Sequence, residues 1–233
     1  MAVICERFDT LGQDCPNRSY ALGIMGGTFD PIHLGHLAVA EQARDKLELD
    51  AVVFMPAGRQ PYKIDQEQLS PLKRLEMCRL AVQDNAHFDV SSLEVERSGI
   101  TYTVDTLKTL RAHYPSNVKL YFIAGADSIA TLANWKDAQE LSQLASFVGI
   151  NRPGTKLIGD KAIKKSLQEA GFTVEFIHAP SLDISSTDLR RRIASGGSIR
   201  YLIPEPVRLV IEAENLYHYR DHENDHKNGR VGD

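Results

Sequence analysis

Gly-Gly-Thr-Phe-Asp-Pro-Ile-His-Leu-Gly-His, at positions 26 to 36, is the stretch that decides the fold class of this chain. An apolar run, residues 20–25, precedes it and is typical of a buried strand. A helical pattern with Ala40, Ala43 and Leu47 on one face follows it. The stretch is therefore predicted to be the loop that leads from a strand into a helix.

This loop has the chemistry of a phosphate-binding site. Gly26 and Gly27 lack a β-carbon, so the backbone is able to turn sharply there and its amides can approach an anion closely. The unpaired amides and the dipole of the following helix favour negative charge. His33 and His36 are three residues apart, which predicts that both imidazoles lie on one helix face and point at the same anion.

Simpler interpretations exist for each part of this loop. A Gly-Gly pair alone is usually a turn, and Asp-Pro is common between a loop and a helix. His-x-x-His can be half of a zinc site, but Cys5, Cys15 and Cys78 form no close pair to complete it. The combination, between a strand and a helix, favours phosphate, and no side chain is predicted to bind a metal directly.

Composition indicates one ordinary globular domain. The chain has 233 residues, 42% of them hydrophobic, which is ample to bury a core. Lys and Arg number 27 against 31 Asp and Glu, so no broad attraction to nucleic acid is expected. Charges within the first ten residues argue against a secretory signal, and no apolar run approaches the roughly 18 residues of a membrane span. With its scattered thiols, the chain is predicted to be cytoplasmic.

Strand-like and helical segments alternate along the chain. Apolar runs rich in β-branched residues cover 22–25, 52–55, 88–90, 118–124, 146–150 and 173–177. Helical periodicity covers 34–48, 71–83, 103–113, 137–145 and 160–170. This alternation predicts an α/β fold, a doubly wound, mostly parallel Rossmann-like sheet with helices on both faces.

Residues 20–217 are predicted to form this domain. Residues 1–19 show no clear periodicity and are predicted to be an N-terminal extension, and residues 218–233 are predicted to be a polar, disordered tail. Both ends are expected to fray. Ligands of parallel sheets gather at the carboxyl ends of the strands, so the loops that follow the strands are expected to converge on one site.

A second informative segment is Ile-Ser-Ser-Thr-Asp-Leu-Arg at 184 to 190. Ser185 and Asp188 resemble a capping box, with aspartate in place of the usual glutamate, which predicts a helix start. A capped helix alone would explain one serine. Three consecutive hydroxyls and an arginine one turn later favour a second phosphate cradle, because hydroxyls bind oxygens and a guanidinium adds a fork of donors.

These two segments resemble the nucleotidylyltransferase superfamily, and the long first motif resembles the bacterial nicotinate-mononucleotide adenylyltransferase family. Further segments that fit this family are 56–63, 96–107, 125–135, 151–154 and 184–190, so the resemblance covers about residues 20 to 217. It implies transfer of the adenylyl group of ATP to nicotinate mononucleotide, in NAD biosynthesis, with pyrophosphate leaving. Mg²⁺ is expected to travel on the phosphates, and the partners are small nucleotides.

The resemblance also implies roles for individual residues. Four are expected to act in catalysis, namely His33, His36, Lys63 and Arg190. Contacts to ATP are expected from Gly26, Gly27, Thr28, Phe29, His33, His36, Gly125, Asp127, Ile184, Ser185, Ser186, Thr187 and Arg190. Contacts to the mononucleotide are expected from Lys63, Thr101, Tyr102, Thr103, Trp135 and Arg152. Tyr62 departs from the family, which more often has histidine there.

Several of these residues have structural alternatives. Lys63 and Arg152 can be surface residues, Asp127 can cap a helix, and Trp135 can pack in the core. Thr103 is predicted to be the N-cap of the helix that follows it. The amides and dipole of that helix would favour a carboxylate over a neutral amide, hence nicotinate over nicotinamide.

Other functions fit the sequence less well. A relative that uses nicotinamide mononucleotide or phosphopantetheine is the nearest, although enzymes for phosphopantetheine usually lack the Thr-Tyr-Thr and Trp segments. Aminoacylation of tRNA would require a Lys-Met-Ser-Lys-Ser loop, which the sequence lacks. A non-catalytic nucleotide-binding regulator would be favoured by loss of the histidines or of Arg190, all of which are present. Homo-oligomerisation stays open.

Overall fold

The computed structural model describes residues 4–59, 68–151, 161–178 and 182–218. Its strands are β1 (Tyr20–Gly27), β2 (Ala51–Pro56), β3 (Phe88–Val90), β4 (Val118–Gly125), β5 (Ser146–Asn151) and β6 (Val174–His178). They form one sheet in the order β3-β2-β1-β4-β5-β6, and every neighbouring pair is parallel. The predicted doubly wound α/β fold is therefore confirmed.

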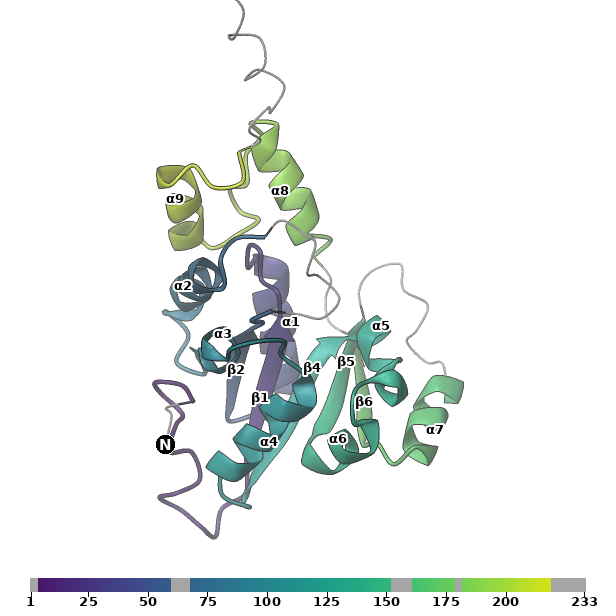
Figure 1. The fold of residues 1–233 in the computed structure, drawn as a ribbon. Helices are drawn as coiled ribbons and strands as arrows, with labels where there is room; N and C mark the ends of the chain where they lie inside the picture. Colours follow the sequence, from purple (N-terminus) through teal and green to yellow (C-terminus); the bar gives the residue numbers. More distant parts are fainter. Residues whose placement is uncertain (1–3, 60–67, 152–160, 179–181, 219–233) are drawn as a thin grey trace, which may run out of the picture.

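Helices cover both faces of this sheet (Figure 1). They are α1 (Leu34–Lys46), α2 (Pro71–Val82), α3 (Leu93–Glu96), α4 (Thr103–His113), α5 (Ala126–Ile129), the 3-10 helix η1 (Leu132–Asn134), α6 (Ala138–Leu144), α7 (Lys161–Glu169), α8 (Ser186–Ala194) and α9 (Glu205–Ala213). Figure 1 shows α8 and α9 standing over one end of the sheet. Within the described ranges, no helix has the length and apolar character needed to cross a membrane.

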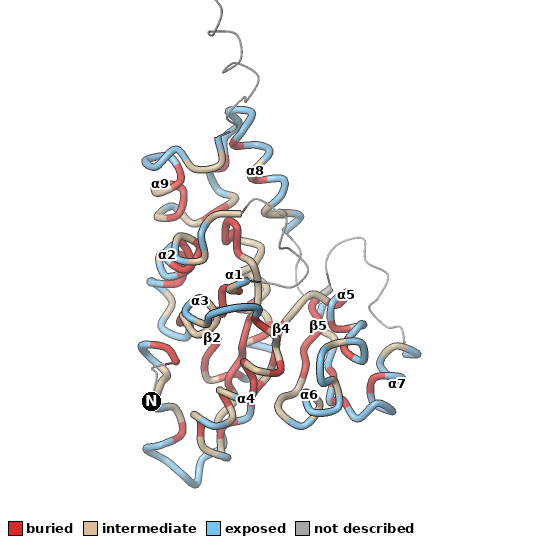
Figure 2. Tube along the Cα trace, in the orientation of Figure 1, coloured by how far each residue is buried: buried red, intermediate tan, exposed pale blue. Residues whose placement is uncertain are grey.

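The core consists of two apolar clusters, one on each face of the sheet. Helices α1, α2 and α9 contribute to one cluster, and α4, α6 and α7 contribute to the other. Successive residues of a strand alternate between the clusters, as a strand's period of two requires. Val52 and Phe54 of β2 face one cluster, whereas Val53 and Met55 face the other. Every residue of β2 is accordingly buried, as Figure 2 shows in red.

Residues 4–19, the described part of the N-terminal segment, pack on the domain instead of fraying. Ile4 and Cys5 are 2% and 3% exposed and belong to the cluster under α4. The Arg7 guanidinium donates to the carbonyl oxygens of Gln83, Asn85 and Phe88, at 2.7 to 3.1 Å, just beyond the end of α2. The expected fraying is therefore wrong for this segment, because isolated anchors hold it and such anchors leave no periodic signal. Residues 219–233 of the predicted tail lie outside the described residues.

Candidate active site

The strand order of the sheet places its switch point between β1 and β4, and we call the position beyond the carboxyl ends of these two strands the crevice. Strand β1 is flanked by β2 on one side and β4 on the other, so the order of strands reverses there. In sheets of this kind ligands bind at such a reversal, beyond the carboxyl ends of the strands. Gly26 and Gly27 end β1, and Gly125 ends β4 and is the N-cap of α5. All three glycines therefore lie at this crevice.

Gly26 and Gly27 do not form the sharp turn that the sequence suggested. Both continue β1 and are paired with residues of β2. A β-carbon at Gly27 would lie 2.7 Å from the ring of Phe29, and one at Gly26 would lie 3.0 Å from the ring of Phe122. The turn falls instead at Phe29, whose φ is +51°. The glycines therefore make room for aromatic rings, one of which comes from β4.

The two histidines lie together, but not on one helix face. His33 is the N-cap of α1 with an extended backbone, and only His36 is helical. The backbone N–H of His33 donates to Nδ1 of His36 at 3.2 Å, and the backbone N–H of His36 donates to the carbonyl oxygen of His33 at 2.9 Å. Their rings stack with centroids 3.6 Å apart, and the Phe29 ring meets His36 edge-on at 5.0 Å. The hydrogen bond to His36 and the ring contacts therefore hold both imidazoles together at the start of α1.

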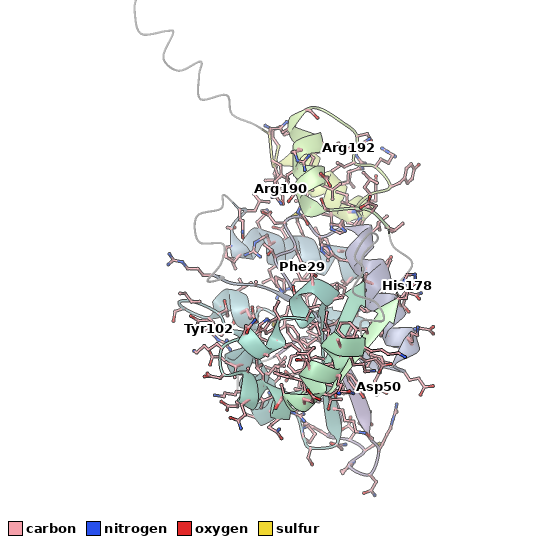
Figure 3. The ribbon with its side chains drawn as sticks, turned by 90° about the vertical axis from the view of Figure 1, so that its right-hand side faces the viewer. Phe29, Asp50, Tyr102, His178, Arg190 and Arg192 are labelled. Carbon is pink, nitrogen blue, oxygen red and sulfur yellow. The ribbon has the colours of Figure 1, made fainter. Side chains whose placement is uncertain are left out.

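The hydroxyl-rich segment meets the histidine loop directly. Ser186 Oγ donates to the carbonyl oxygen of Pro31 at 2.9 Å, and Arg190 Nη1 donates to that of Asp30 at 2.6 Å. Figure 3 shows Arg190 on α8 above Phe29. The first amide of α1, at Leu34, donates to the carbonyl oxygen of Leu202 at 3.0 Å. Two helix starts that are distant in sequence thus open beside each other.

The start of α8 is capped as the sequence predicted. Ser185 is the N-cap, and its Oγ accepts from the backbone N–H of Asp188 at 3.1 Å. The same hydroxyl donates to the Asp188 carboxylate at 2.6 Å. Thr187 Oγ1 accepts from Arg190 Nη2 at 3.4 Å, and Ile184 packs against the core. The side chains predicted to bind phosphate therefore gather around one helix start.

Tyr217 belongs to this site and was not predicted from the sequence. Its hydroxyl donates to Oδ1 of Asp30 at 2.7 Å, and Asp30 itself is 2% exposed. Burial, and then the Asp30 carboxylate, raise the pKa of the Tyr217 hydroxyl well above its usual range, so the hydroxyl stays protonated and donates. Tyr217 follows the last helix, and only its contact with the distant loop reveals its role.

Replacing Tyr217 with phenylalanine should destabilise the protein measurably. The variant leaves Oδ1 of a buried carboxylate without its donor, which should lower the free energy of unfolding by about 2 kcal/mol. Urea denaturation followed by circular dichroism measures this change. Tyr201, which is 82% exposed, offers the matched control, and Tyr201→Phe should stay within about 0.5 kcal/mol of wild type. Equal stability of the two variants would contradict the role of Tyr217.

Arg74 is a second residue that sequence reasoning missed. Its side chain is 1% exposed and donates to the carbonyl oxygens of Thr28 at 2.5 Å, Ala57 at 2.7 Å and Leu69 at 3.2 Å. Burial lowers the pKa of its guanidinium, and the charge of Asp30 acts in the opposite direction. Arg74 therefore ties the loop after β1 to the loop after β2.

A signal for Arg74 was present in the sequence. Position 74 falls on the same face of α2 as the buried residues Cys78 and Ala81, at helical spacing. A charged residue on the apolar stripe of a helix needs partners inside the protein. That pattern distinguishes it from Arg79, which lies on the same helix and is exposed.

The expected mononucleotide segment is fixed to the loop after β2. The backbone N–H and the hydroxyl of Thr101 both donate to the carbonyl oxygen of Arg59, at 3.0 and 3.2 Å. Tyr102, and not Thr103, is the N-cap of α4, and its side chain makes no capping hydrogen bond. These hydrogen bonds at Thr101 precede Tyr102, whose backbone is extended, so the helix begins one residue earlier than the predicted Thr103 N-cap implied.

Gly58, in the loop after β2, should not tolerate a side chain. A β-carbon there would overlap the backbone carbonyl oxygen of Glu94 and lie 3.1 Å from Oγ1 of Thr101. Gly58→Ala should therefore lower the free energy of unfolding by about 2 kcal/mol, since a helix backbone cannot move aside as a flexible side chain can. Thermal or urea unfolding tests this, and wild-type stability of the variant would show that the loop adjusts freely.

Trp135 is neither fully buried nor fully exposed. Its ring is half-buried and packs edge-on against Phe122 at 6.0 Å, and its Nε1 donates to Oγ1 of Thr131 at 3.2 Å. Phe122 is the ring for which Gly26 makes room, so Trp135 is close to the crevice. Asp127 is exposed in the first turn of α5, whose N-cap is Gly125, so the alternative role of Asp127 as an N-cap is wrong.

Two of the predicted site residues fall outside the described part of the chain, and the described residues form no metal site. Lys63 and Arg152 lie outside the described residues. Among the residues that are described, no three His, Cys, Asp or Glu side chains gather as a metal site would require. The donors around the crevice are imidazoles, hydroxyls, a guanidinium and helix amides. Such donors suit phosphate oxygens, whereas Mg²⁺ prefers carboxylates and water.

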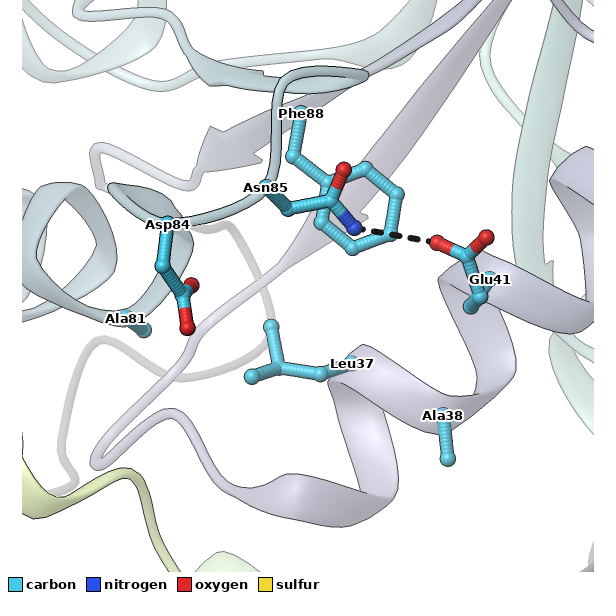
Figure 4. A pocket seen from close by; sticks show the side chains of 7 residues that line it. All are labelled: Leu37, Ala38, Glu41, Ala81, Asp84, Asn85 and Phe88. Carbon is cyan, nitrogen blue, oxygen red and sulfur yellow. Dashed lines mark hydrogen bonds between the residues drawn. The ribbon is translucent and has the colours of Figure 1, made fainter.

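A cavity of about 300 Å³ lies between α1 and the connection from α2 to β3 (Figure 4). Leu37, Ala38 and Phe88 form its apolar surface, and Asn85 donates to Glu41 at 3.0 Å beside it. None of the residues predicted to bind ATP or a mononucleotide lines this cavity. It is therefore distinct from the crevice at the carboxyl edge.

Comparisons with known proteins point to one family. The cytidylyltransferase-like family model matches residues 24–192. A probable nicotinate-nucleotide adenylyltransferase of Desulfitobacterium hafniense (strain Y51) is 47% identical over 197 residues, spanning 84% of this chain and 95% of the relative. Another, of Thermoanaerobacter sp. (strain X514), is 43% identical over 208 residues, spanning 89% and 98%. The Plasmodium falciparum nicotinic acid mononucleotide adenylyltransferase complexed with NaAD has a similar fold, with TM-score 0.69, 23% identity and coverage of 85% and 97%.

Proposed function

The chain belongs to the cytidylyltransferase-like family and, within it, to the nicotinate-nucleotide adenylyltransferases, and on that premise we propose how its residues carry out the reaction. It is a nucleotidyltransferase that transfers the adenylyl group of ATP to nicotinate mononucleotide. The observation that carries this function is the meeting of the two helix starts, joined by Ser186 and Arg190, at the crevice between β1 and β4.

The reaction is an in-line displacement at phosphorus. A 5′-phosphate oxygen of the mononucleotide attacks the α-phosphorus of ATP, while the bond from that phosphorus to the oxygen bridging the α- and β-phosphates breaks. Pyrophosphate leaves with the bonding electron pair, and the dinucleotide remains. No covalent intermediate with the protein is required, so catalysis consists of positioning and charge stabilisation.

His33 and His36 are proposed to stabilise charge around the α-phosphate. Their stacked rings lie at the start of α1, whose dipole also favours an anion there. Donors that are oriented before the reaction need no reorganisation as charge develops. Thr28 and Phe29, which form the turn before this helix, are proposed to shape the same side of the ATP site.

The start of α8 is proposed to hold the β- and γ-phosphates. Ser185, Ser186 and Thr187 offer hydroxyl oxygens and helix amides, and Arg190 adds a guanidinium whose position is fixed by Asp30. Lys63, which follows β2 in the sequence, is proposed as a further cation for this chain of phosphates. Arg152 is proposed, on its place after β5, to reach the mononucleotide phosphate.

Mg²⁺ is proposed to enter as part of the ATP substrate. The donors described around the crevice are cationic or neutral, which fits a triphosphate that brings its own counter-ion. When bound, the ion supplies neutralisation of phosphate charge. The hydroxyls of Ser185, Ser186 and Thr187 and the Arg190 guanidinium would bind phosphate oxygens.

The acceptor is proposed to bind between α4 and Trp135. The half-buried indole can stack on a pyridine ring, which by analogy with bases contributes about 1–3 kcal/mol. Thr101, Tyr102 and Thr103 present the start of α4, whose amides favour a carboxylate over an amide. Gly125, Asp127 and Ile184 are proposed to contact ATP. We also propose that the protein acts in the cytoplasm, with residues 20–217 as its catalytic unit.

An acceptor panel tests this function. Pyrophosphate release with MgATP should be fastest with nicotinate mononucleotide, slower with nicotinamide mononucleotide and absent with phosphopantetheine. Adding EDTA should abolish release by removing Mg²⁺ from ATP. Tight ATP binding without turnover on any acceptor would identify a regulator and would reject the proposed function.

A further inference from the structure

Lys136 lies beside the aromatic residues of the proposed acceptor site. It follows Trp135 in the chain, and its Nζ is 4.1 Å from the centroid of the Tyr102 ring. The same ammonium is 3.8 Å from Oδ2 of Asp105, in the first turn of α4. The Lys136 side chain is 45% exposed. Two contacts therefore hold a cation beside the site, and solvent can reach it, so Asp105 can be exchanged for another anion.

The aromatic residues alone cannot distinguish the two pyridine mononucleotides. One face of the Tyr102 ring is covered by the Lys136 ammonium, which leaves stacking chiefly to Trp135. Nicotinate and nicotinamide rings stack alike, since they differ only in a carboxylate and a neutral amide on the ring. Discrimination therefore requires a charge or directed donors at the edge of the ring.

Carboxylates near Lys136 would repel an acceptor that carries a carboxylate. Glu140, Asp137 and Asp105 all act on the Lys108 ammonium of α4 and raise its pKa. Lys108 is paired with Glu140 at 2.8 Å. Without Lys136, an incoming carboxylate would face Asp105 directly, and like charges would offset the favourable dipole of α4.

We propose that Lys136 selects an acceptor that carries a carboxylate on its pyridine ring. Its ammonium exchanges Asp105 for that carboxylate while the acceptor is bound. This inference rests on the proposed function and adds a specificity residue to it. The contacts of Lys136 in the described part of the chain are with Tyr102 and Asp105 at the start of α4, so we expect its effect on the KM of the acceptor and not on kcat.

Steady-state kinetics with both mononucleotides tests the proposal. In Lys136→Met, the ratio of kcat/KM for the nicotinate acceptor to that for the nicotinamide acceptor should fall about fivefold, mainly through KM of the nicotinate acceptor. Lys136→Arg should keep the ratio. Lys108→Met, the matched control on α4, should leave the ratio unchanged. A change below twofold in Lys136→Met, or equal losses with both acceptors, would overturn the proposal.

Two further measurements separate charge from structure. Added salt should lower the ratio in the wild type and leave it unchanged in Lys136→Met, because an exposed ion pair is screened. Asp105→Asn should lower KM for the nicotinate acceptor, because it removes the competing anion. A ratio that salt leaves unchanged in the wild type would contradict the exchange of Asp105 for the substrate carboxylate. A KM for the nicotinate acceptor that is unchanged or higher in Asp105→Asn would contradict it as well.

Binding gives an independent measurement of the same ratio. Trp135 is the single tryptophan of the sequence, so its fluorescence reports mononucleotide binding at this position. If the wild type formed no dinucleotide with either acceptor, the proposed function would be wrong, and the ratio of the two dissociation constants would still decide the role of Lys136. Equal ratios in the wild type and in Lys136→Met would reject that role.

Discussion

Removing the His36 side chain should lower kcat by about 10²- to 10³-fold, because one oriented donor to the reacting phosphate is lost. The His36→Ala variant should still fold, with a cost of about 1 kcal/mol for the lost cap on the His33 amide. Pyrophosphate release under saturating MgATP and nicotinate mononucleotide measures the rate, and urea denaturation measures the cost to stability.

A second variant separates catalysis from capping at this position. In His36→Asn, the side-chain oxygen can take the place of Nδ1 and accept from the His33 amide, but no donor reaches the position of Nε2. This variant should be as stable as the wild type and as slow as His36→Ala. His87→Ala, an exposed histidine just before β3, is the control and should keep full activity. Near-wild-type turnover of His36→Ala in folded protein would refute the assigned role.

Replacing Arg74 with methionine should lower the free energy of unfolding by about 3 kcal/mol. The variant removes the donors to the carbonyl oxygens of Thr28, Ala57 and Leu69, and buried acceptors left without partners each carry a desolvation cost. Removing a buried charge offsets part of this cost. The free energy of unfolding of Arg74→Lys should lie between those of the wild type and Arg74→Met, since one ammonium cannot reach all three oxygens. Urea denaturation gives the values.

The same helix supplies the control for Arg74. Arg79 is exposed on α2, and Arg79→Met should change the free energy of unfolding by less than about 0.5 kcal/mol. Arg74→Met should also raise KM for ATP, because the two loops that Arg74 joins flank the crevice. If both methionine variants unfolded at the same urea concentration, the buried hydrogen bonds of Arg74 would contribute nothing to stability.

The alternation of apolar runs and helical periods was enough to predict the parallel sheet and most of its helices. Predicted and observed boundaries of β3 and α4 coincide, because period and composition are local properties. Helix α9 was not predicted, since it is short and begins next to two prolines. The packing of the N-terminal segment was not predicted either, because its anchors Ile4 and Arg7 follow no period.

The segments that form the site were predicted more reliably than the geometry of their residues. The two phosphate-like segments were identified from residue types, and the structure places them in contact. The sequence-based explanation for glycine at position 26, a sharp turn, was wrong. Glycine makes room there for the ring of Phe122, which comes from a strand far along the sequence. Tyr217 and Arg74 act through backbone or carboxylate partners distant in the chain, and local patterns carry little information about such partners.

The contacts from the last part of the chain have a consequence for where the working unit ends. Similarity to the family model stops at residue 192, yet the Leu202 carbonyl holds the first amide of α1, and the Tyr217 hydroxyl holds Asp30. A protein shortened to residue 200 would keep all six described strands and lose both of these tethers. It would also lose Ile203, Val207 and Ile211 from one core cluster, so a fragment cut near the family-model boundary would be both less stable and, without anchorage of its histidine loop, a poor enzyme.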